Sequence, residues 1–355
     1  MKAKEYSLVR LFGRFIKDST TGKRLKPDGK RLKKGSIENY GCILLLLKKF
    51  EAASGTKVLI RPKESYTRKQ AIAEKQYWKL FYFNFTTYMY TNGCYDNYVG
   101  SAIKCIRAFF NYLEQDLLMP VGKFHEDFYI TRQEVPIVTL EPKHLQFLIY
   151  NKAFENSLPR FLRKIKDIFV TGCTVALRYC DLIKIAWHNI ELRNGRYYLC
   201  VTAQKTGTIT RVRLPGYVMA ILNKYRVVGP FGKKIFPALS LHRFNYNIRR
   251  IMELAGHTQP IGKWRNKQGI EFAQQHPRTK RAYRFCDLVS SHTMRRTAIT
   301  TMLMQGVPEN IVKQISGHTN DSSSFYRYVN LAQSYIDTHL DIYFDKMMEG
   351  RPEEV

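Results

Sequence analysis

Apolar residues in the N-terminal part of the chain recur at the three- and four-residue spacing of an amphipathic helix. From Ser36 onward, Ile37, Tyr40, Ile43, Leu44 and Leu47 follow this spacing. The same period predicts two more helices, over residues 69–90 and 97–114. Lys104 and Arg107 flank the apolar stripe of the last one. The pattern predicts a small helical bundle with a basic face, which is either an ordinary solvated surface or a DNA-binding surface.

The second part of the chain mixes helical periodicity with one β-rich stretch. Residues 196–202 alternate between the two faces of a strand after an Asn194-Gly195 turn, and residues 209–214 form the expected return strand. Lys205 therefore lies at the tip of a predicted hairpin. Further helices are expected from Pro142 and over residues 159–170, 241–255, 293–305, 308–316 and 332–348.

These elements predict a mainly α fold with a small antiparallel β-sheet, of the α+β class. A loop that contains Pro120, Gly122 and Pro136 indicates a domain boundary. We expect a helical domain over residues 35–132, a mixed α/β domain over residues 137–348 and a tail over residues 349–355. Residues 1–34 are rich in Lys, Arg and Gly, and we interpret them as a basic extension, either a solvated leader or a DNA-contacting arm.

The charge of the chain narrows the class of partner. Its 355 residues include 58 Lys+Arg against 29 Asp+Glu, for a net charge of +29. This excess favours a polyanion, with nucleic acid first and an anionic membrane surface second. The basic residues are spread along the chain, which favours a structured face over a disordered arm. No apolar run reaches the roughly 18 residues of a membrane span.

Cysteine usage argues against a disulfide framework and against a zinc site. The seven cysteines are odd in number and form no C-x-x-C pair, which favours a reducing compartment. His292 and His318 are far apart in sequence, with no cysteine pair beside them. We therefore expect no metal.

A cluster of cations near the C-terminus suggests phosphodiester chemistry. Arg295 follows His292 by three residues, so both side chains share one face of a predicted helix. Arg296 points about 100° away and is assigned to the DNA backbone or to structure. His318 follows Gly317 at the end of a short helix, where its imidazole is placed to donate to a phosphate oxygen. Such donors stabilise the charge that a phosphoryl transition state develops.

Two upstream residues extend this set. Arg178 lies in an apolar segment that we interpret as helical, and Asp181 is placed three residues later to hold it. On its own this is as consistent with a structural ion pair as with catalysis. Lys205 alone would be a solvated turn residue. As a catalyst it would protonate a leaving oxygen, which Lys does more readily than Arg.

Two tyrosines compete for the role of nucleophile, Tyr326 and Tyr328 in the segment Phe325-Tyr326-Arg327-Tyr328-Val329. The ordered set of Arg178, Lys205, His292, Arg295 and His318 resembles the active-site pattern of the tyrosine recombinase (phage integrase) family. In that family the tyrosine usually lies nine residues after the Gly-His histidine, and here that position is Arg327. Tyr328 is preferred because its segment resembles the F-x-x-Y-[IV] form with one extra loop residue, and Tyr326 is the second choice.

The resemblance covers residues 36–345 and implies both architecture and reaction. It implies a helical core-binding domain and a catalytic domain that close as a C-shaped clamp on double-stranded DNA with specific recombination sites. It implies a 3′-phosphotyrosyl intermediate, a Holliday junction and a homotetramer on DNA, without metal or ATP. The final helix, through Ile336, Leu340, Ile342 and Met347, is expected to pack on a neighbouring protomer or within its own chain.

Several alternatives stay open at this point. A type IB topoisomerase shares the chemistry, and a non-catalytic DNA-binding regulator shares the charge. A membrane-surface protein is the least favoured class, since no basic amphipathic helix with an exposed apolar face is evident. Without an evident arm-binding domain, we expect an inversion enzyme or the integrase of a small mobile element, in the bacterial cytoplasm at the nucleoid.

Overall fold

The computed structural model describes residues 5–204, 207–226, 234–319 and 322–349. It consists of helices and three small antiparallel sheets, so the predicted mainly α class with a small antiparallel sheet is confirmed. The chain divides into two compact units. Residues 1–135 and 263–274 form the first unit, and residues 136–262 and 275–355 form the second. None of the helices in the described part combines the length and apolar character that a bilayer crossing requires.

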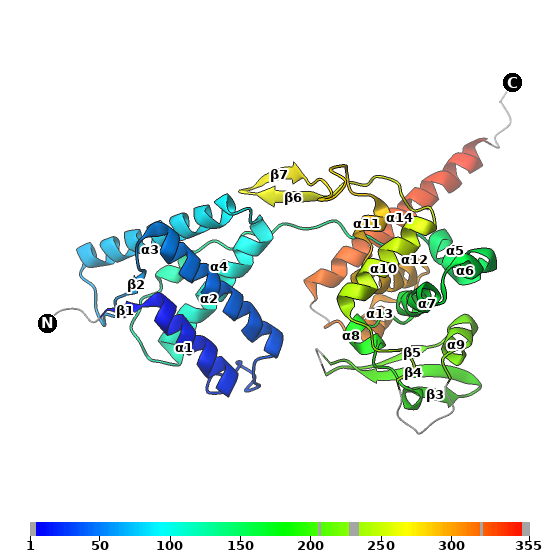
Figure 1. Cartoon of the computed structure of the whole chain (residues 1–355), viewed down its shortest axis with the longest axis horizontal. Helices are drawn as coiled ribbons and strands as arrows, with labels where there is room; N and C mark the ends of the chain where they lie inside the picture. The colour runs from blue at the N-terminus through cyan, green and yellow to red at the C-terminus, as the bar shows by residue number, and fades with distance from the viewer. Residues whose placement is uncertain (1–4, 205–206, 227–233, 320–321, 350–355) are drawn as a thin grey trace. The chain divides into compact units, whose positions relative to one another are not determined.

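The first unit is a bundle of four long helices around an aromatic core (Figure 1). Its elements are β1 (Tyr6–Ser7), α1 (Leu8–Thr21), α2 (Lys34–Ser54), β2 (Leu59–Ile60), α3 (Arg68–Thr91), α4 (Asp96–Gln115) and the short 3-10 helix η1 (Phe124–Asp127). The helices predicted over residues 69–90 and 97–114 are confirmed as α3 and α4. Phe12, Phe15, Phe85 and Phe109 are fully buried at the centre of the bundle.

The interpretation of residues 1–34 as a basic extension is wrong for residues 8–21, which form helix α1 of the first unit. Leu8, Leu11, Phe12 and Phe15 recur at helical spacing and are buried in the core of the first unit. The sequence analysis overlooked this apolar spacing because it described the segment by its high content of Lys and Arg. Ser7 caps the helix by accepting a hydrogen bond from Arg10 N at 3.4 Å.

A hairpin from far along the chain completes the first unit. It consists of β6 (Trp264–Lys267) and β7 (Ile270–Ala273), and its turn lies on the start of α4. The buried carboxylate of Asp96 accepts hydrogen bonds from Gln268 N at 2.8 Å and Gly269 N at 3.0 Å. The chain therefore passes between the two units three times, at residues 135–136, 262–263 and 274–275.

The second unit holds helices and a three-stranded sheet around one large core. Its helices are α5 (Pro142–Tyr150), α6 (Lys152–Ser157), α7 (Arg160–Val175), α8 (Tyr179–Leu182), α9 (Gly216–Asn223), α10 (Leu241–Leu254), α11 (Phe285–Leu288), α12 (Ser291–Met304), α13 (Glu309–Ser316) and α14 (Ser323–Glu349), with the 3-10 helix η2 (Trp187–Asn189). The sheet has the order β3 (Ile190–Arg193), β4 (Arg196–Thr202) and β5 (Ile209–Arg213). The predicted strands and the Asn194-Gly195 turn are confirmed, since Asn194 and Gly195 both adopt positive φ.

Close packing of α7 against α12 depends on one glycine. A Cβ atom at Gly172 would lie 2.3 Å from Met294 Sδ, so a larger residue would force the Met294 side chain to move. The absent side chain lets the two helices approach. This approach brings the end of α7 beside the first half of α12, where Arg295 lies.

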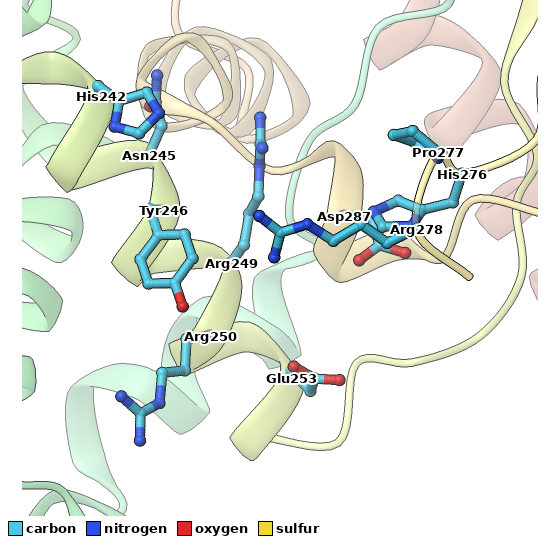
Figure 2. A pocket seen from close by; sticks show the side chains of 10 residues that line it. All are labelled: His242, Asn245, Tyr246, Arg249, Arg250, Glu253, His276, Pro277, Arg278 and Asp287. Carbon is cyan, nitrogen blue, oxygen red and sulfur yellow. The ribbon is translucent and has the colours of Figure 1, made fainter. Parts of the chain in front are cut away.

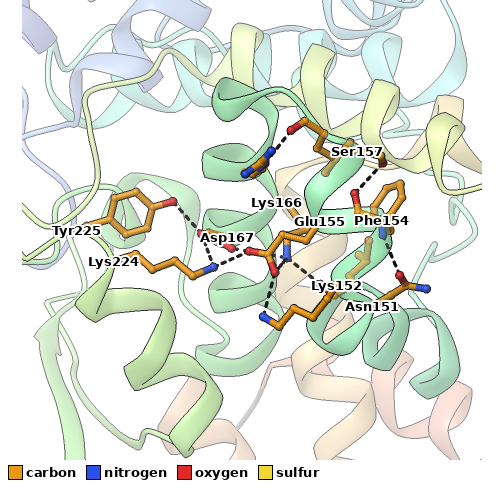
Figure 3. A network of polar contacts seen from close by, with 12 residues as sticks. Asn151, Lys152, Phe154, Glu155, Ser157, Lys166, Asp167, Lys224 and Tyr225 are labelled. Carbon is orange, nitrogen blue, oxygen red and sulfur yellow. Dashed lines mark hydrogen bonds and ion pairs between the residues drawn. The ribbon is translucent and has the colours of Figure 1, made fainter.

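A buried polar network joins α6, α7 and α9 (Figure 3). Lys224 Nζ lies 2.6 Å from Glu155 Oε1 and 3.3 Å from Asp167 Oδ2, and Tyr225 donates to Asp167 Oδ2 at 2.9 Å. Burial raises the pKa of Glu155, but hydrogen bonds from Lys224 and Lys152 outweigh it and bring the pKa to about 2. The ionised carboxylate therefore stabilises this end of the second unit.

Replacing Glu155 is expected to change how stability depends on pH. Because the folded-state pKa lies below the unfolded value, the carboxylate contributes stability above about pH 4.5, and this is lost as pH falls toward 2. Glu155→Gln should lower the free energy of unfolding at pH 7 by on the order of 1–3 kcal/mol, and it should flatten the decline between pH 5 and 2. Denaturant unfolding across this pH range measures both effects.

The exposed Glu64 offers the control, since Glu64→Gln removes the same charge without a buried partner. Equal unfolding free energies for the two variants at pH 7 would contradict the role of the network.

Candidate active site

Arg295 is the centre of the candidate site, and two helix ends bind it. The residue is 7% exposed. Nη1 donates to the carbonyl of Ala176 at 2.7 Å, and Nη2 donates to the carbonyl of Ser316. Ala176 follows the last residue of α7 and Ser316 is the last residue of α13. Carbonyls at helix C-termini lack intrahelical donors and carry partial negative charge, so they stabilise a buried cation.

This arrangement leaves the formal charge of Arg295 uncompensated. Its close hydrogen-bond acceptors are two neutral carbonyls, and among the described residues no acidic side chain forms an ion pair with it. Burial, reinforced by the charge of Arg178, lowers the pKa of Arg295 to about 10, so it remains protonated at neutral pH. A full positive charge is thus held at this point of the second unit by neutral groups.

His318 lies against this guanidinium. Gly317 ends α13 in the left-handed conformation, with φ of 61°, and the chain turns so that His318 is half-buried. Arg295 Nη2 is 3.5 Å from both ring nitrogens, and Ser316 Oγ is 2.7 Å from Nδ1. Burial and the charges of Arg295, Arg178 and Lys313 lower the pKa of His318 to about 4. The imidazole is therefore neutral at physiological pH in the DNA-free protein.

Arg178 does not lie within a helix, contrary to the sequence interpretation. The left-handed Ala176, with φ of 56°, ends α7, and Arg178 is the extended residue that precedes α8. Its side chain is half-buried, and its charge acts on both Arg295 and His318. The break in the helix turns the chain at this point and brings Arg178 near Arg295 and His318.

The expected pairing of Asp181 with Arg178 is also corrected. Among the described residues, no ion pair joins these two side chains; instead Asp181 Oδ1 accepts a hydrogen bond from Gln204 N at 3.0 Å. Lys184 Nζ donates a hydrogen bond to Gln204 Oε1 at 2.8 Å. Asp181 therefore anchors the end of β4, immediately before Lys205, which lies outside the described residues.

His292 and Arg296 are the remaining candidates on α12. His292 is exposed at the second position of the helix, one turn before Arg295, and Arg296 is half-buried. Lys104 and Arg107 belong to α4 of the first unit. Lys104 is exposed, while Arg107 is half-buried with Nη1 3.5 Å from Phe128 O.

The two tyrosines fall on different sides of α14. Residues two positions apart on a helix point about 200° apart, so only one of them faces a given neighbour. The ring of Tyr328 is half-buried, with its centroid 6.0 Å from that of His318. Tyr326 is 49% exposed, and Lys313 Nζ lies 4.9 Å from its ring centroid. The geometry favours Tyr328 as the tyrosine of the cation cluster.

Sequence reasoning missed two groups of this site. The carbonyl of Ala176 is invisible to side-chain motifs, and Ser316 was assigned only to the end of a helix. A Ser two residues before the Gly-His histidine was the available signal. Its hydroxyl is close enough to the imidazole to orient it.

A second basic site lies along α10 in the same unit (Figure 2). A cavity of about 720 Å³ is lined by His242, Asn245, Tyr246, Arg249, Arg250, Glu253, His276, Pro277, Arg278 and Asp287. Arg249 is held by the carbonyl of Val289 at 3.2 Å, while Arg250 and Arg278 are exposed. Arginines around a polar cavity suit phosphate oxygens.

Part of the chain, mostly in the second unit, matches a known protein family. Residues 166–334 match the model of the phage integrase family. No curated protein matches the chain by sequence.

Solved structures resemble the chain along most of its length. XerH site-specific recombinase bound to a palindromic difH substrate is 12% identical with a TM-score of 0.57, over 95% of this chain and 96% of that one. A lambda integrase(75-356) dimer bound to a COC′ core site is 14% identical with a TM-score of 0.54, over 93% and 95%. The Tn1549 transposon integrase with transposon right end DNA is 12% identical with a TM-score of 0.55, over 94% and 99%. At these identities the likeness concerns the fold.

The hydrogen bonds of Arg295 to the carbonyls of Ala176 and Ser316 predict that lysine cannot replace it. A lysine carries the same charge but lacks the planar fork that reaches two carbonyls at once. Arg295→Lys should lower the unfolding free energy by about 1–3 kcal/mol, because a buried carbonyl loses its partner. Arg243, exposed over the Phe161 ring at 4.6 Å, supplies the control substitution Arg243→Lys. Equal unfolding free energies of the two variants would contradict a stabilising role for the two Arg295–carbonyl hydrogen bonds.

Proposed function

We propose that the chain is a tyrosine recombinase, since residues 166–334 match the phage integrase family, and that Tyr328 is its nucleophile in site-specific DNA recombination. The observation that carries this proposal is the buried, uncompensated Arg295 with neutral His318 and half-buried Tyr328 beside it. A buried cation without a carboxylate partner costs stability, and a bound anion would offset that cost. The scissile phosphate is that anion.

The proposed reaction is a transesterification at phosphorus. The phenol of Tyr328 releases its proton to solvent as its oxygen attacks phosphorus, a 3′-phosphotyrosyl bond forms and the bond to the 5′ oxygen breaks. Lys205 is proposed to give its proton to that oxygen, while Arg178, His292 and Arg295 stabilise the non-bridging oxygens. The number of phosphodiester bonds is conserved, so the reverse attack by a 5′-hydroxyl from a partner duplex completes strand exchange.

DNA binding is proposed to involve basic residues of both units. In the second unit, the cavity along α10 offers Arg250 and Arg278 to phosphates, with Arg296 on α12 as a further backbone contact. In the first unit, Lys104 is exposed on α4 and Arg107 lies beside it. The net charge of +29 supports this assignment. A core-binding role for the first unit and a clamp around the duplex belong to the same proposal.

Assembly is proposed to follow the family's route through a homotetramer and a Holliday junction. In the described part of α14, Leu340 is 44% exposed and Phe344 is 56% exposed. Apolar side chains of this kind suit a helix that docks on a neighbouring protomer. Ile336 is half-buried, and Ile342 and Met347 lie outside the described side chains. A bacterial mobile element is the proposed setting.

Covalent capture of DNA is the first test of the nucleophile. Tyr328→Phe should abolish the covalent protein–DNA adduct and retain DNA binding, because only the attacking oxygen is lost. Tyr326→Phe is the matched control and should retain the adduct. The measurement is recovery of DNA that stays attached to denatured protein from cells, followed by sequencing of its ends.

Each outcome of this capture separates the competing functions. An adduct that survives in Tyr328→Phe and disappears in Tyr326→Phe moves the nucleophile by two positions. Site-independent relaxation of supercoiled plasmid would indicate a type IB topoisomerase. Absence of any adduct, with unaltered biological activity of Arg295→Ala, would indicate a DNA-binding regulator.

The basic cavity predicts a change in salt dependence. Arg250→Gln with Arg278→Gln should weaken DNA binding and reduce the slope of log affinity against log salt by about one per lost phosphate contact. Arg160→Gln, an exposed arginine outside the cavity, should leave the slope unchanged. Fluorescence anisotropy with duplex DNA at several salt concentrations measures this. An unchanged slope in the double variant removes the cavity from the DNA-binding surface.

A further inference from the structure

Lys313 of α13 places its ammonium against two aromatic rings of α14. Nζ lies 5.0 Å from the ring centroid of Phe325 and 4.9 Å from that of Tyr326. Both distances are within the range of a cation–π contact, in which the face of the ring attracts the charge. The side chain of Lys313 is only 12% exposed, so these contacts form away from bulk water. One ammonium therefore joins α13 to the first turn of α14.

The surroundings of this ammonium combine one carboxylate with the two rings. Glu309 Oε2, one turn earlier on α13, lies 3.6 Å from Lys313 Nζ, and the Glu309 side chain is 44% exposed. An ion pair with an exposed carboxylate contributes little, whereas a lysine removed from water loses hydration. The aromatic faces replace part of that hydration. Much of the attraction that holds the ammonium in place therefore comes from α14.

The two rings leave α14 in different directions, and for this reason the contact fixes the rotation of the helix. Successive residues of an α-helix are about 100° apart around its axis. Phe325 is fully buried in the core cluster that includes Ala298 and Val312, while the adjacent Tyr326 lies at the surface. A rotation of α14 about its own axis would move at least one ring away from the ammonium. The contact thus sets both the position and the rotation of this turn.

Tyr328 lies two residues beyond Tyr326, in the turn that Lys313 holds. Its ring centroid is 6.3 Å from that of Phe325 and 6.0 Å from that of His318. Lys313 also positions the histidine, since its carbonyl accepts a hydrogen bond from His318 N at 3.0 Å. The backbone of one residue therefore binds the histidine, while its side chain binds the helix that bears the tyrosine.

We propose that Lys313 is a positioning residue for Tyr328. Its ammonium binds the rings of Phe325 and Tyr326 and so keeps the first turn of α14 in the place from which the phenol attacks. Tyr326 then acts through the face of its ring and needs no hydroxyl. A displacement of about 1 Å can slow a reaction on the order of a hundredfold, so such a contact affects the rate. The kinetic part of this inference rests on the proposed function, whereas the anchoring of α14 does not.

Hydrogen exchange of the full-length protein without DNA tests the anchoring. Lys313→Met keeps the length of the side chain and removes its charge, so the amides of residues 325–329 should exchange about two- to fivefold faster. Arginine also stacks on aromatic faces, so Lys313→Arg should retain the wild-type exchange. Lys143→Met is the matched control, since Lys143 pairs with Glu141 at 2.8 Å through a side chain that is 73% exposed. Unchanged exchange in Lys313→Met would overturn the inference.

Single-turnover formation of the covalent adduct, on the DNA site recovered by covalent capture, tests the effect on the rate. Lys313→Met should slow this step about tenfold or more at saturating DNA. It should leave DNA affinity unchanged, because the ammonium lies against the rings and is little exposed. Lys313→Arg should restore most of the rate, and Lys143→Met should match the wild type. A wild-type rate in Lys313→Met, or a loss of DNA affinity in place of rate, contradicts the positioning role.

Variants of Tyr326, which is 49% exposed, test the ring itself. Tyr326→Phe keeps the ring and should keep the rate, whereas Tyr326→Leu should slow adduct formation about as much as Lys313→Met does. Because the two side chains are expected to act through one contact, the double variant should be no slower than the slower single variant. Effects that multiply in the double variant show that this contact is not the cause and remove the proposal.

The exchange and rate measurements separate this inference from the proposed function. If Lys313→Met speeds exchange in α14 but the wild type forms no adduct on any DNA, the proposed function fails and the anchoring of α14 stands. If the wild type cleaves DNA while Lys313→Met changes neither exchange nor rate, the role of Lys313 fails and the proposed function stands.

Discussion

The buried guanidinium of Arg295 between two helix C-termini is the constraint on which the second unit depends. Its two hydrogen bonds to Ala176 and Ser316 require that α7 and α13 end at this point and that α12 pass between them. Gly172 permits the close approach of α7 and α12, and the left-handed Ala176 stops α7 there. A change in any of these elements would leave a cation or a carbonyl buried without its partner, which is more costly than the loss of a surface contact.

Helix ends, rather than carboxylates, stabilise the buried positive charge in the site that we propose binds phosphate. A carboxylate beside Arg295 would stabilise it but would also compete with the substrate. Partial charges at helix termini stabilise the cation while they leave its formal charge for the anion. The same unit places its carboxylates elsewhere: Glu155 and Asp167 pair with lysines between α6, α7 and α9, and Asp181 binds the backbone of Gln204. Scaffold and site thus use opposite electrostatic solutions.

The connection between the units adds a second constraint. A chain that crossed once would leave the units joined by a single tether, but this chain crosses three times because the β6–β7 hairpin belongs to the first unit. The buried Asp96 at the start of α4 binds the hairpin turn through two backbone amides. Asp96 is 4% exposed, so the hairpin turn covers the start of α4, while the side chains of β7 stay exposed.

Local periodicity predicted most helices and two of the three strands of the main sheet, β4 and β5, because apolar spacing and the Asn194-Gly195 turn are short-range signals. The residue types around His292, Arg295 and His318 likewise predicted phosphate chemistry. Sequence analysis did not predict α1, because its apolar positions lie among basic residues. It also predicted an ion pair between Arg178 and Asp181, whereas Asp181 binds the backbone amide of Gln204. Only tertiary structure decided that backbone carbonyls bind Arg295, that Tyr328 rather than Tyr326 lies beside His318, and that Ser316 contacts its ring. These features depend on where helices end and on which side of α14 meets α13, and long-range packing sets both.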